Sequence, residues 1–223
     1  MLMAVEGLMR GGTTGVTVGL GSLGIALPAI VQGGDAAQID RYVRPTLAGE
    51  TIAALAITEP GTGSDVASVR TRAVRDGDHY VVNGAKMFIT SGVRADFITT
   101  LVRSGDDPHG GLSFLVIEKD MPGVSFGANE RKLGWHSQPT AQVIFEDVRI
   151  PVDNRVGGEG EGFRIAMMGL DGGRLNIGAC SLGGAQRCLD EAIAYTRERK
   201  QFGTAIADFQ NTQFTLADMA TDL

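Results

Sequence analysis

Thr58-Glu59-Pro60-Gly61-Thr62-Gly63-Ser64-Asp65 and Lys86-Met87-Phe88-Ile89-Thr90-Ser91-Gly92 are the two stretches that decide how this chain is expected to fold. The first follows the apolar run 52–57, and its proline and glycines predict a loop. Thr58 and Ser64 therefore fall on irregular backbone, where a ligand can meet hydroxyls and free amides.

The second stretch combines an aromatic side chain with a hydroxyl. Phe88 offers an aromatic face two residues from the hydroxyl of Thr90. In the first stretch, Gly61 and Gly63 permit a close ligand approach that a side chain would block. Together the two stretches favour a site for a flat heteroaromatic ring with polar edges.

The composition is that of ordinary globular material. The 223 residues are 43% hydrophobic and 21% charged, which suits one or two compact domains. A formal net charge of -6 and a pI near 5.1 argue against a nucleic-acid partner, since a phosphate-binding surface carries a basic stripe. The weakly polar residues 11–32 contain several glycines and Pro28, so no membrane span is expected.

Neither a disulfide framework nor a metal site is expected. Cys180 and Cys188 fall within one predicted helix, which favours buried small side chains and suits a reducing compartment. His79, His109 and His136 share no metal-ligand spacing with each other or with the cysteines.

The hydrophobic pattern divides the chain into three sections. Residues 1–50 are predicted to be helical, with Asp35 as an N-cap and Gly49 as a stop. Residues 51–156 are predicted to form a β-domain, and residues 157–223 to be helical again.

The predicted strands are 52–57, 97–102, 112–117 and 143–145, with a hairpin of 69–75 and 79–83 around Asp76-Gly77. Residues 157–162 are predicted to be a flexible connector. A long helix is predicted over 175–196, and a second from near Thr204 to Leu223.

Two alternative sites are weaker. Residues 19–24 match GxGxxG, with 13–18 as the imagined preceding strand, but the polar helical pattern 35–40 stands where a nucleotide-binding fold needs a second strand. Gly63-Ser64-Asp65 lacks the second flanking glycine of a hydrolase nucleophile elbow. A nicotinamide enzyme and a hydrolase are therefore disfavoured.

TEPGTGSD followed by KMFITSG resembles the two flavin-contacting signatures of the acyl-CoA dehydrogenases. The likeness continues through GWHSQPT (134–140), VIFEDVRIP (143–151) and RKQFG (199–203), while 169–182 and 213–223 look most like the isobutyryl-CoA dehydrogenase branch. The resemblance implies an α+β fold with a helical N-terminal part, a middle β-barrel domain and an incomplete C-terminal helical bundle.

The resemblance implies FAD as the cofactor. Ile57 and Thr58 would approach the pyrimidine edge of the isoalloxazine ring, Thr90 would lie at the flavin N5, and Phe88 would lie against the ring. Many relatives carry tryptophan at the position of Phe88, and phenylalanine keeps the aromatic face.

A second group of residues would hold the rest of FAD. By resemblance, Arg199, Phe202 and Gln210 grip the adenine and pyrophosphate, often across a subunit boundary, so a homo-oligomer, a tetramer in relatives, is expected. A guanidinium such as that of Arg199 pairs with phosphate oxygens in a bidentate manner. Without the resemblance, residues 197–200 would be a solvated charged face.

For an acyl-CoA substrate, Ser64 would line the entrance, Asp171 would contact the pantetheine portion, and Arg174 would shape the mouth of the acyl pocket. The plain alternative is that Asp171 and Arg174, three residues apart, form an intrahelical ion pair.

The implied activity is FAD-dependent α,β-dehydrogenation of a short or branched acyl-CoA, such as isobutyryl-CoA, with electrons passed to an electron-transfer flavoprotein. No catalytic base is assigned: the usual family position is expected beyond Leu223, and the position that some relatives use instead is Gly173, next to Gly172. The chain is therefore expected to be truncated at both ends and nearly inactive alone.

Two other functions remain open. One is a catalytically silent acyl-CoA or flavin-binding fragment that lacks the base, and the other is an acyl-CoA oxidase. The expected location is the cytoplasm of a bacterium, or the mitochondrial matrix in a eukaryote.

Overall fold

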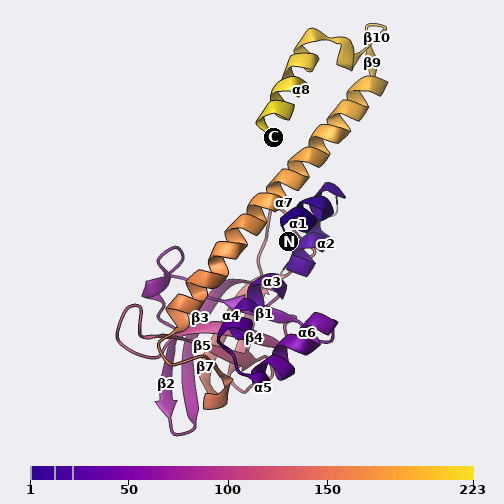
Figure 1. Cartoon of the computed structure of the whole chain (residues 1–223). Helices are drawn as coiled ribbons and strands as arrows, with labels where there is room; N and C mark the ends of the chain where they lie inside the picture. The colour runs from indigo at the N-terminus through magenta and orange to yellow at the C-terminus, as the bar shows by residue number, and fades with distance from the viewer. Residues whose placement is uncertain (1, 13, 22) are drawn as a thin grey trace. The chain divides into compact units, whose positions relative to one another are not determined.

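The computed structural model describes residues 2–12, 14–21 and 23–223 (Figure 1). The chain separates into two compact units. The sheet unit contains residues 18–173, and the helical unit contains residues 1–17 and 174–223.

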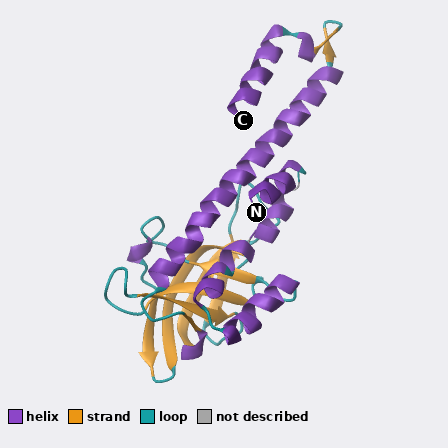
Figure 2. Cartoon of the chain, viewed as in Figure 1, coloured by secondary structure: helices purple, strands orange, loops and turns teal. Residues whose placement is uncertain are grey.

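Helices come first along the chain, most of the strands follow, and the chain then returns to helices; Figure 2 colours the two kinds of element. The helices are α1 (Leu2–Arg10), α2 (Thr14–Gly21), α3 (Leu23–Ala26), α4 (Pro28–Gly33), α5 (Ala36–Gln38), the π-helix η1 (Ile39–Val43), α6 (Arg44–Ala48), the 3₁₀ turns η2 (Val66–Ser68), η3 (Val152–Asn154) and η4 (Ile206–Asp208), α7 (Gly162–Glu198) and α8 (Gln210–Asp222). The strands are β1 (Ala53–Ala56), β2 (Arg72–Asp76), β3 (His79–Thr90), β4 (Phe97–Arg103), β5 (Leu112–Glu118), β6 (Val124–Asn129), β7 (Thr140–Pro151), β8 (Arg155–Val156), β9 (Lys200–Gln201) and β10 (Thr204–Ala205).

The sheet unit is built on one eight-stranded sheet. Its strand order is β6-β7-β3-β2-β4-β5-β8, and β1 pairs in parallel with β4 beside this path. The long antiparallel pair of β3 and β7 carries two register shifts, one of them between Lys86 and Ile89. That irregularity falls inside the second stretch singled out in the sequence.

The expected β-barrel is wrong, because the sheet is open. Among the described residues, no ladder joins β6 at one end to β8 at the other. Two features keep it open: β8 is two residues long, and β2 meets β4 at the single pair Arg72 and Arg103. A strand as short as β8 offers too few backbone groups to close a barrel.

Apolar side chains fill both faces of the central strands. In β4, Phe97 and Leu101 belong to one core cluster, and Ile98 and Val102 belong to the other. The first cluster also contains Ile30 and other side chains of the short helices that cover that face. Burial on both faces explains why these strands are continuous apolar runs in the sequence.

Most predicted elements are confirmed. Asp35 caps α5 by accepting the N–H of Gln38 at 2.8 Å, and Gly49 ends α6 with φ 80°. Gly77, with φ 62°, forms the turn between β2 and β3. Strand β6 and the full lengths of β3 and β7 were not predicted, because their polar residues interrupt the apolar runs.

The GxGxxG segment is helical where it is described. Residues 14–21 form α2, so no strand precedes it; Thr13, part of the imagined strand, and Ser22 lie outside the described residues. Residues 157–161 connect β8 to α7 as expected, whereas Gly162 already begins α7; the flexibility of the connector stays a prediction.

In the helical unit, α1 packs on α7. Gly183 allows this approach, because a Cβ there would lie 2.3 Å from the main-chain oxygen of Glu6, and Arg10 pairs with Asp190 at 2.9 Å. The last helix begins at Gln210 rather than near Thr204, because β9, β10 and η4 come first. No helix in the described part of the chain is long and apolar enough to cross a membrane.

Two glycine substitutions should change stability in opposite directions. At Gly84, φ is +147° and a Cβ would lie 2.7 Å from Oγ1 of Thr71, so Gly84→Ala should lower the free energy of unfolding by about 1–3 kcal/mol. At Gly178, inside α7, a Cβ would meet no described atom within 4 Å. Gly178→Ala should therefore raise the free energy of unfolding by about 0.5–1 kcal/mol. Urea unfolding measures both, and equal effects at the two positions would contradict this account.

Candidate functional site

The two stretches singled out in the sequence meet at the end of β1. Ile57 is buried, Thr58 is half-buried, and the main-chain oxygen of Thr58 accepts the N–H of Met87 at 2.8 Å. The loop of residues 58–65, called here the hydroxyl loop, is thereby held against the bulge in β3.

Phe88 occupies this bulge in a strained conformation. Its φ is 59°, in the left-handed region that bulky side chains avoid, and its side chain is 60% exposed. Strain of this kind costs about 1–3 kcal/mol and is concentrated at functional sites. The bulge leaves the aromatic ring exposed instead of burying it in the core.

The end of β3 is tied to residues 134–140. The N–H of Ser91 donates to the main-chain oxygen of Pro139 at 2.8 Å, and its hydroxyl donates to Oε1 of Gln138 at 3.0 Å. The hydroxyls of Thr90 and Thr140 lie 3.5 Å apart. The position of Thr90 is therefore fixed by its neighbours on both sides.

A polar pocket of about 190 Å³ lies beside this end of β3. Lys132 organises it by donating to the main-chain oxygens of Trp135 and Gln138 and to the hydroxyl of Thr140. The pocket is lined by Arg94, Asn129, Glu130, Lys132, His136, Gln138, Pro139 and Thr140.

An ion pair that the sequence analysis missed joins the hydroxyl loop to β3. The side chain of Lys86 is 0% exposed, and its Nζ donates to Oε1 of Glu59 at 2.8 Å and to the main-chain oxygen of Ile57 at 3.0 Å. The same carboxylate accepts the N–H groups of Arg70 and Thr71 at 2.7 and 2.8 Å. The sequence signal that could have found this pair is that Glu59 lies in the first of the two quoted stretches and Lys86 in the second.

Burial and charge act in opposite directions on this pair. Burial lowers the pKa of Lys86 to about 8, although the neighbouring carboxylate favours its charged form. Burial also tends to raise the pKa of Glu59, but the charge and hydrogen bond of Lys86, with the bonds from Thr71 and Arg70, outweigh it and lower that pKa. Both groups are therefore mainly charged at neutral pH.

An arginine from β4 holds the segment that follows the hydroxyl loop. Arg103 donates to the main-chain oxygens of Val69, at 3.0 Å, and Ala67. Glu59 and Arg103 thus hold the backbone of residues 67–71, next to the loop that carries the exposed Ser64.

Three of the predicted site residues lie in the helical unit around the hairpin of β9 and β10. Phe202 and Gly203 have φ values of 53° and 80° at its tip, typical of a type I′ turn, and Phe202 is 98% exposed. Arg199 and Gln210, which flank this region, are also exposed. Their roles toward FAD stay predictions.

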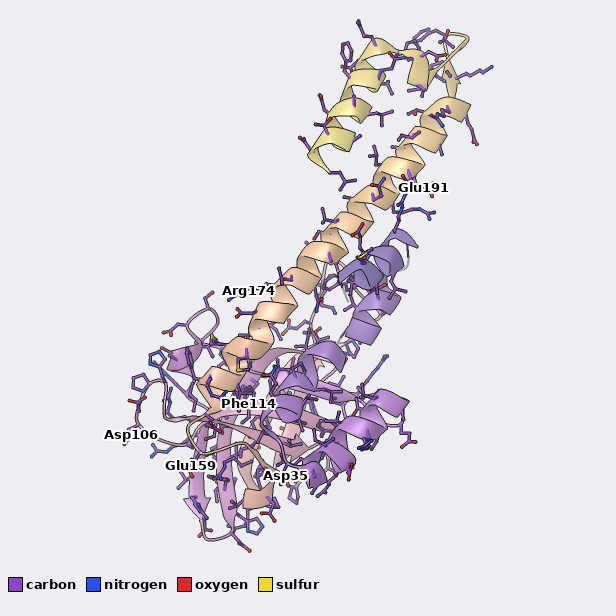
Figure 3. All side chains as sticks on the ribbon, in the orientation of Figure 1. Asp35, Asp106, Phe114, Glu159, Arg174 and Glu191 are labelled. Atoms are coloured by element: carbon purple, nitrogen blue, oxygen red, sulfur yellow. The ribbon has the colours of Figure 1, made fainter. Side chains whose placement is uncertain are left out.

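Asp171 and Arg174 both lie on α7 and are exposed; Figure 3 labels Arg174. Asp171 belongs to the sheet unit and Arg174 to the helical unit. Their roles toward a substrate stay predictions, as does that of Ser64.

The hydroxyl loop has donors left over for a ligand. Within the described ranges, the N–H and the hydroxyl of Thr58 have no hydrogen-bond partner. A half-buried site usually satisfies such groups, so these donors, beside the exposed ring of Phe88, fit the polar edge and flat face of an isoalloxazine. No cluster of metal-ligating side chains occurs in the part of the chain that the structure describes.

An open sheet that is preceded by short helices and followed by a long helix defines an α+β protein. Family models agree with this: "Acyl-CoA dehydrogenase, middle domain" matches residues 54–148, and "Acyl-CoA dehydrogenase, C-terminal domain" matches residues 160–223. The chain belongs to the acyl-CoA dehydrogenase family, whose members are flavoprotein oxidoreductases.

Relatives and solved structures support this assignment. The chain is 51% identical over 187 residues to a protein named isobutyryl-CoA dehydrogenase, mitochondrial, from Dictyostelium discoideum, covering 83% of this chain and 45% of that protein. It is 50% identical over 190 residues to the protein of the same name from Bos taurus, covering 85% of this chain and 46% of that protein. The crystal structure of a probable acyl-CoA dehydrogenase from Mycobacterium abscessus matches with a TM-score of 0.96 and 50% identity, covering 99% of this chain and 59% of that one. The chain thus spans about half the length of the curated relatives it matches.

Glu59→Gln should destabilise the chain in a pH-dependent way. It leaves Lys86 buried without its counter-charge, so the free energy of unfolding at about pH 7 should fall by about 3–5 kcal/mol. Because the pKa of Glu59 is lowered in the folded chain, its stabilisation is present above the ordinary value of 4.5 and is lost as the pH falls. Urea unfolding should show the gap between wild type and variant narrowing towards about pH 4.

The matched control is Glu146→Gln on the exposed side of β7, which should change the free energy of unfolding by less than about 0.5 kcal/mol. A gap between wild type and Glu59→Gln that stays constant or widens on acidification would contradict the assignment.

Proposed function

We propose that this chain binds FAD in the cradle formed by the hydroxyl loop and the β3 bulge, and that it carries the flavin-binding part of an acyl-CoA dehydrogenase. The observation that carries the proposal is the hydrogen bond from Met87 to Thr58, which joins the two segments; among the described residues, the N–H and hydroxyl of Thr58 have no hydrogen-bond partner. The proposed substrate is a short or branched acyl-CoA such as isobutyryl-CoA, as the names of the relatives suggest.

Each residue of the cradle has a proposed task. Ile57 and Thr58 bind the pyrimidine edge of the ring, Thr90 lies at N5, and Phe88 packs on the ring face. A neutral hydrogen bond contributes about 0.5–1.5 kcal/mol net, so the grip on the cofactor is shared among many contacts. When bound, FAD supplies the acceptor for hydride from the β carbon of the acyl group.

The helical unit supplies the second proposed group of contacts. Arg199, Phe202 and Gln210 would hold the adenine and pyrophosphate of FAD, in an assembly of several copies. The exposed Phe202 at a strained turn supports a role in binding rather than in the core.

Substrate contacts are proposed for Ser64, Asp171 and Arg174. Removal of the α proton needs a carboxylate base, and we assign no residue of this chain to that role. We further propose an electron-transfer flavoprotein as electron acceptor, and the division into sections 1–50, 51–156 and 157–223 as the domain organisation. The proposed location is the cytoplasm in a bacterium, or the mitochondrial matrix in a eukaryote.

A catalytically silent flavin-binding or acyl-CoA-binding protein is the second candidate. Gly173 favours it, because by resemblance it stands directly before Arg174, at the position where some relatives carry the base; Gly172 is its neighbour.

The test is the visible spectrum of the FAD-loaded chain before and after anaerobic addition of isobutyryl-CoA. Bleaching of the flavin supports dehydrogenation, and bound flavin that stays oxidised supports the silent protein. Peroxide formation in air would indicate an oxidase. A chain that binds no FAD overturns the proposed function.

Phe88→Ala should weaken FAD binding by about 2- to 10-fold, because an aromatic contact contributes about 0.5–1.5 kcal/mol. Quenching of FAD fluorescence on titration with the protein measures the dissociation constant. Val74→Ala, on the exposed face of β2, is the control and should leave the constant unchanged. Equal dissociation constants for wild type and Phe88→Ala would show that the Phe88 ring does not contribute to FAD binding.

A further inference from the structure

Lys86 is a buried cation that none of the proposed contacts uses. Its Nζ lies 3.0 Å from the main-chain oxygen of Ile57, and that oxygen belongs to the peptide group whose N–H is on Thr58. The ammonium therefore acts on the far side of the peptide that faces the cradle.

A charged donor on a carbonyl oxygen polarises the whole peptide group. Charge-assisted hydrogen bonds are roughly twice as strong as neutral ones, and bonds in series strengthen one another in a low-dielectric interior. The N–H of Thr58, which has no acceptor within the described part of the chain, becomes a stronger donor as a result.

Glu59 and Arg103 hold this arrangement in place. Glu59 accepts from Lys86 and from the N–H groups of Arg70 and Thr71, so the ammonium cannot turn away from the Ile57 oxygen without breaking a buried network. From β4, Arg103 holds the segment that follows the hydroxyl loop. The geometry is set before any ligand binds.

We propose that Lys86 is a positioning residue that raises the electron affinity of the bound cofactor by fixing and polarising the Ile57–Thr58 peptide. This inference rests on the proposed function, because it needs FAD in the cradle. A ring that has accepted electrons carries more negative charge, so a strengthened N–H donor binds reduced FAD more tightly than oxidised FAD.

The two members of the ion pair carry opposite charges and should act in opposite directions. Lys86→Met removes the positive charge and should weaken the binding of reduced relative to oxidised FAD by about tenfold, a fall in potential of about 30 mV for a two-electron couple. At a pH low enough to keep Lys86 protonated without its carboxylate partner, Glu59→Gln removes the opposing negative charge and should raise the potential. If the pair had only a structural role, the reduction potential of bound FAD would shift in the same direction in both variants.

The experiment is an anaerobic titration of the FAD-loaded chain against a reference redox dye, followed by visible absorbance. Arg75→Met is the control: Arg75 donates to the main-chain oxygen of Gly77 at the β2–β3 turn, and its loss should leave the potential unchanged. In the FAD-free chain, Lys86→Met should also shift the Thr58 amide proton to lower frequency in the NMR spectrum.

The outcomes separate the two proposals. Wild-type chain that binds no FAD overturns the proposed function. Wild-type chain that binds FAD, with unchanged potentials or shifts of the same sign in both variants, overturns only the role of Lys86. Both variants are prepared with excess FAD, which stabilises the folded state by mass action. If one of the two variants still fails to fold, the sign of the potential shift in the other variant tests the role of Lys86.

Discussion

The ion pair between Glu59 and Lys86 is the constraint on which the candidate site depends. A buried charge is costly without a partner, and here each charge also has main-chain hydrogen bonds. The pair sets the distance between a loop and a strand that are far apart in sequence. Because a break in it would leave an uncompensated charge inside the sheet unit, the loop stays in place without a ligand.

Strain complements this rigidity. Phe88 and Ser91 both have positive φ on either side of Thr90, and Phe202 has it at the tip of the β9–β10 hairpin. Such conformations persist where the surrounding structure determines them strongly. In the sheet unit, that support comes from the β3–β7 ladder and the bonds from Ser91 to Gln138 and Pro139. The fold thus holds the residues proposed to bind FAD in backbone conformations that an unfolded chain would seldom adopt.

Different parts of the open sheet carry the core and the candidate site. Its central strands bury both faces, so they hold the core, while the bulged β3 and the loop after β1 carry polar groups that the core does not satisfy. Unused donors on a rigid frame lose little freedom when a ligand binds.

The sequence by itself determined the strands of β4 and β5, the Asp35 cap, the turn at Gly77 and the family, because each depends on local pattern or on a contiguous motif. Only the tertiary structure decided that the sheet is open, and that Glu59 finds Lys86, a lysine 27 residues away. Pairing over such a distance leaves no period or spacing in the sequence. The bulge at Phe88 was hidden for the same reason, since it exists only against the register of β7.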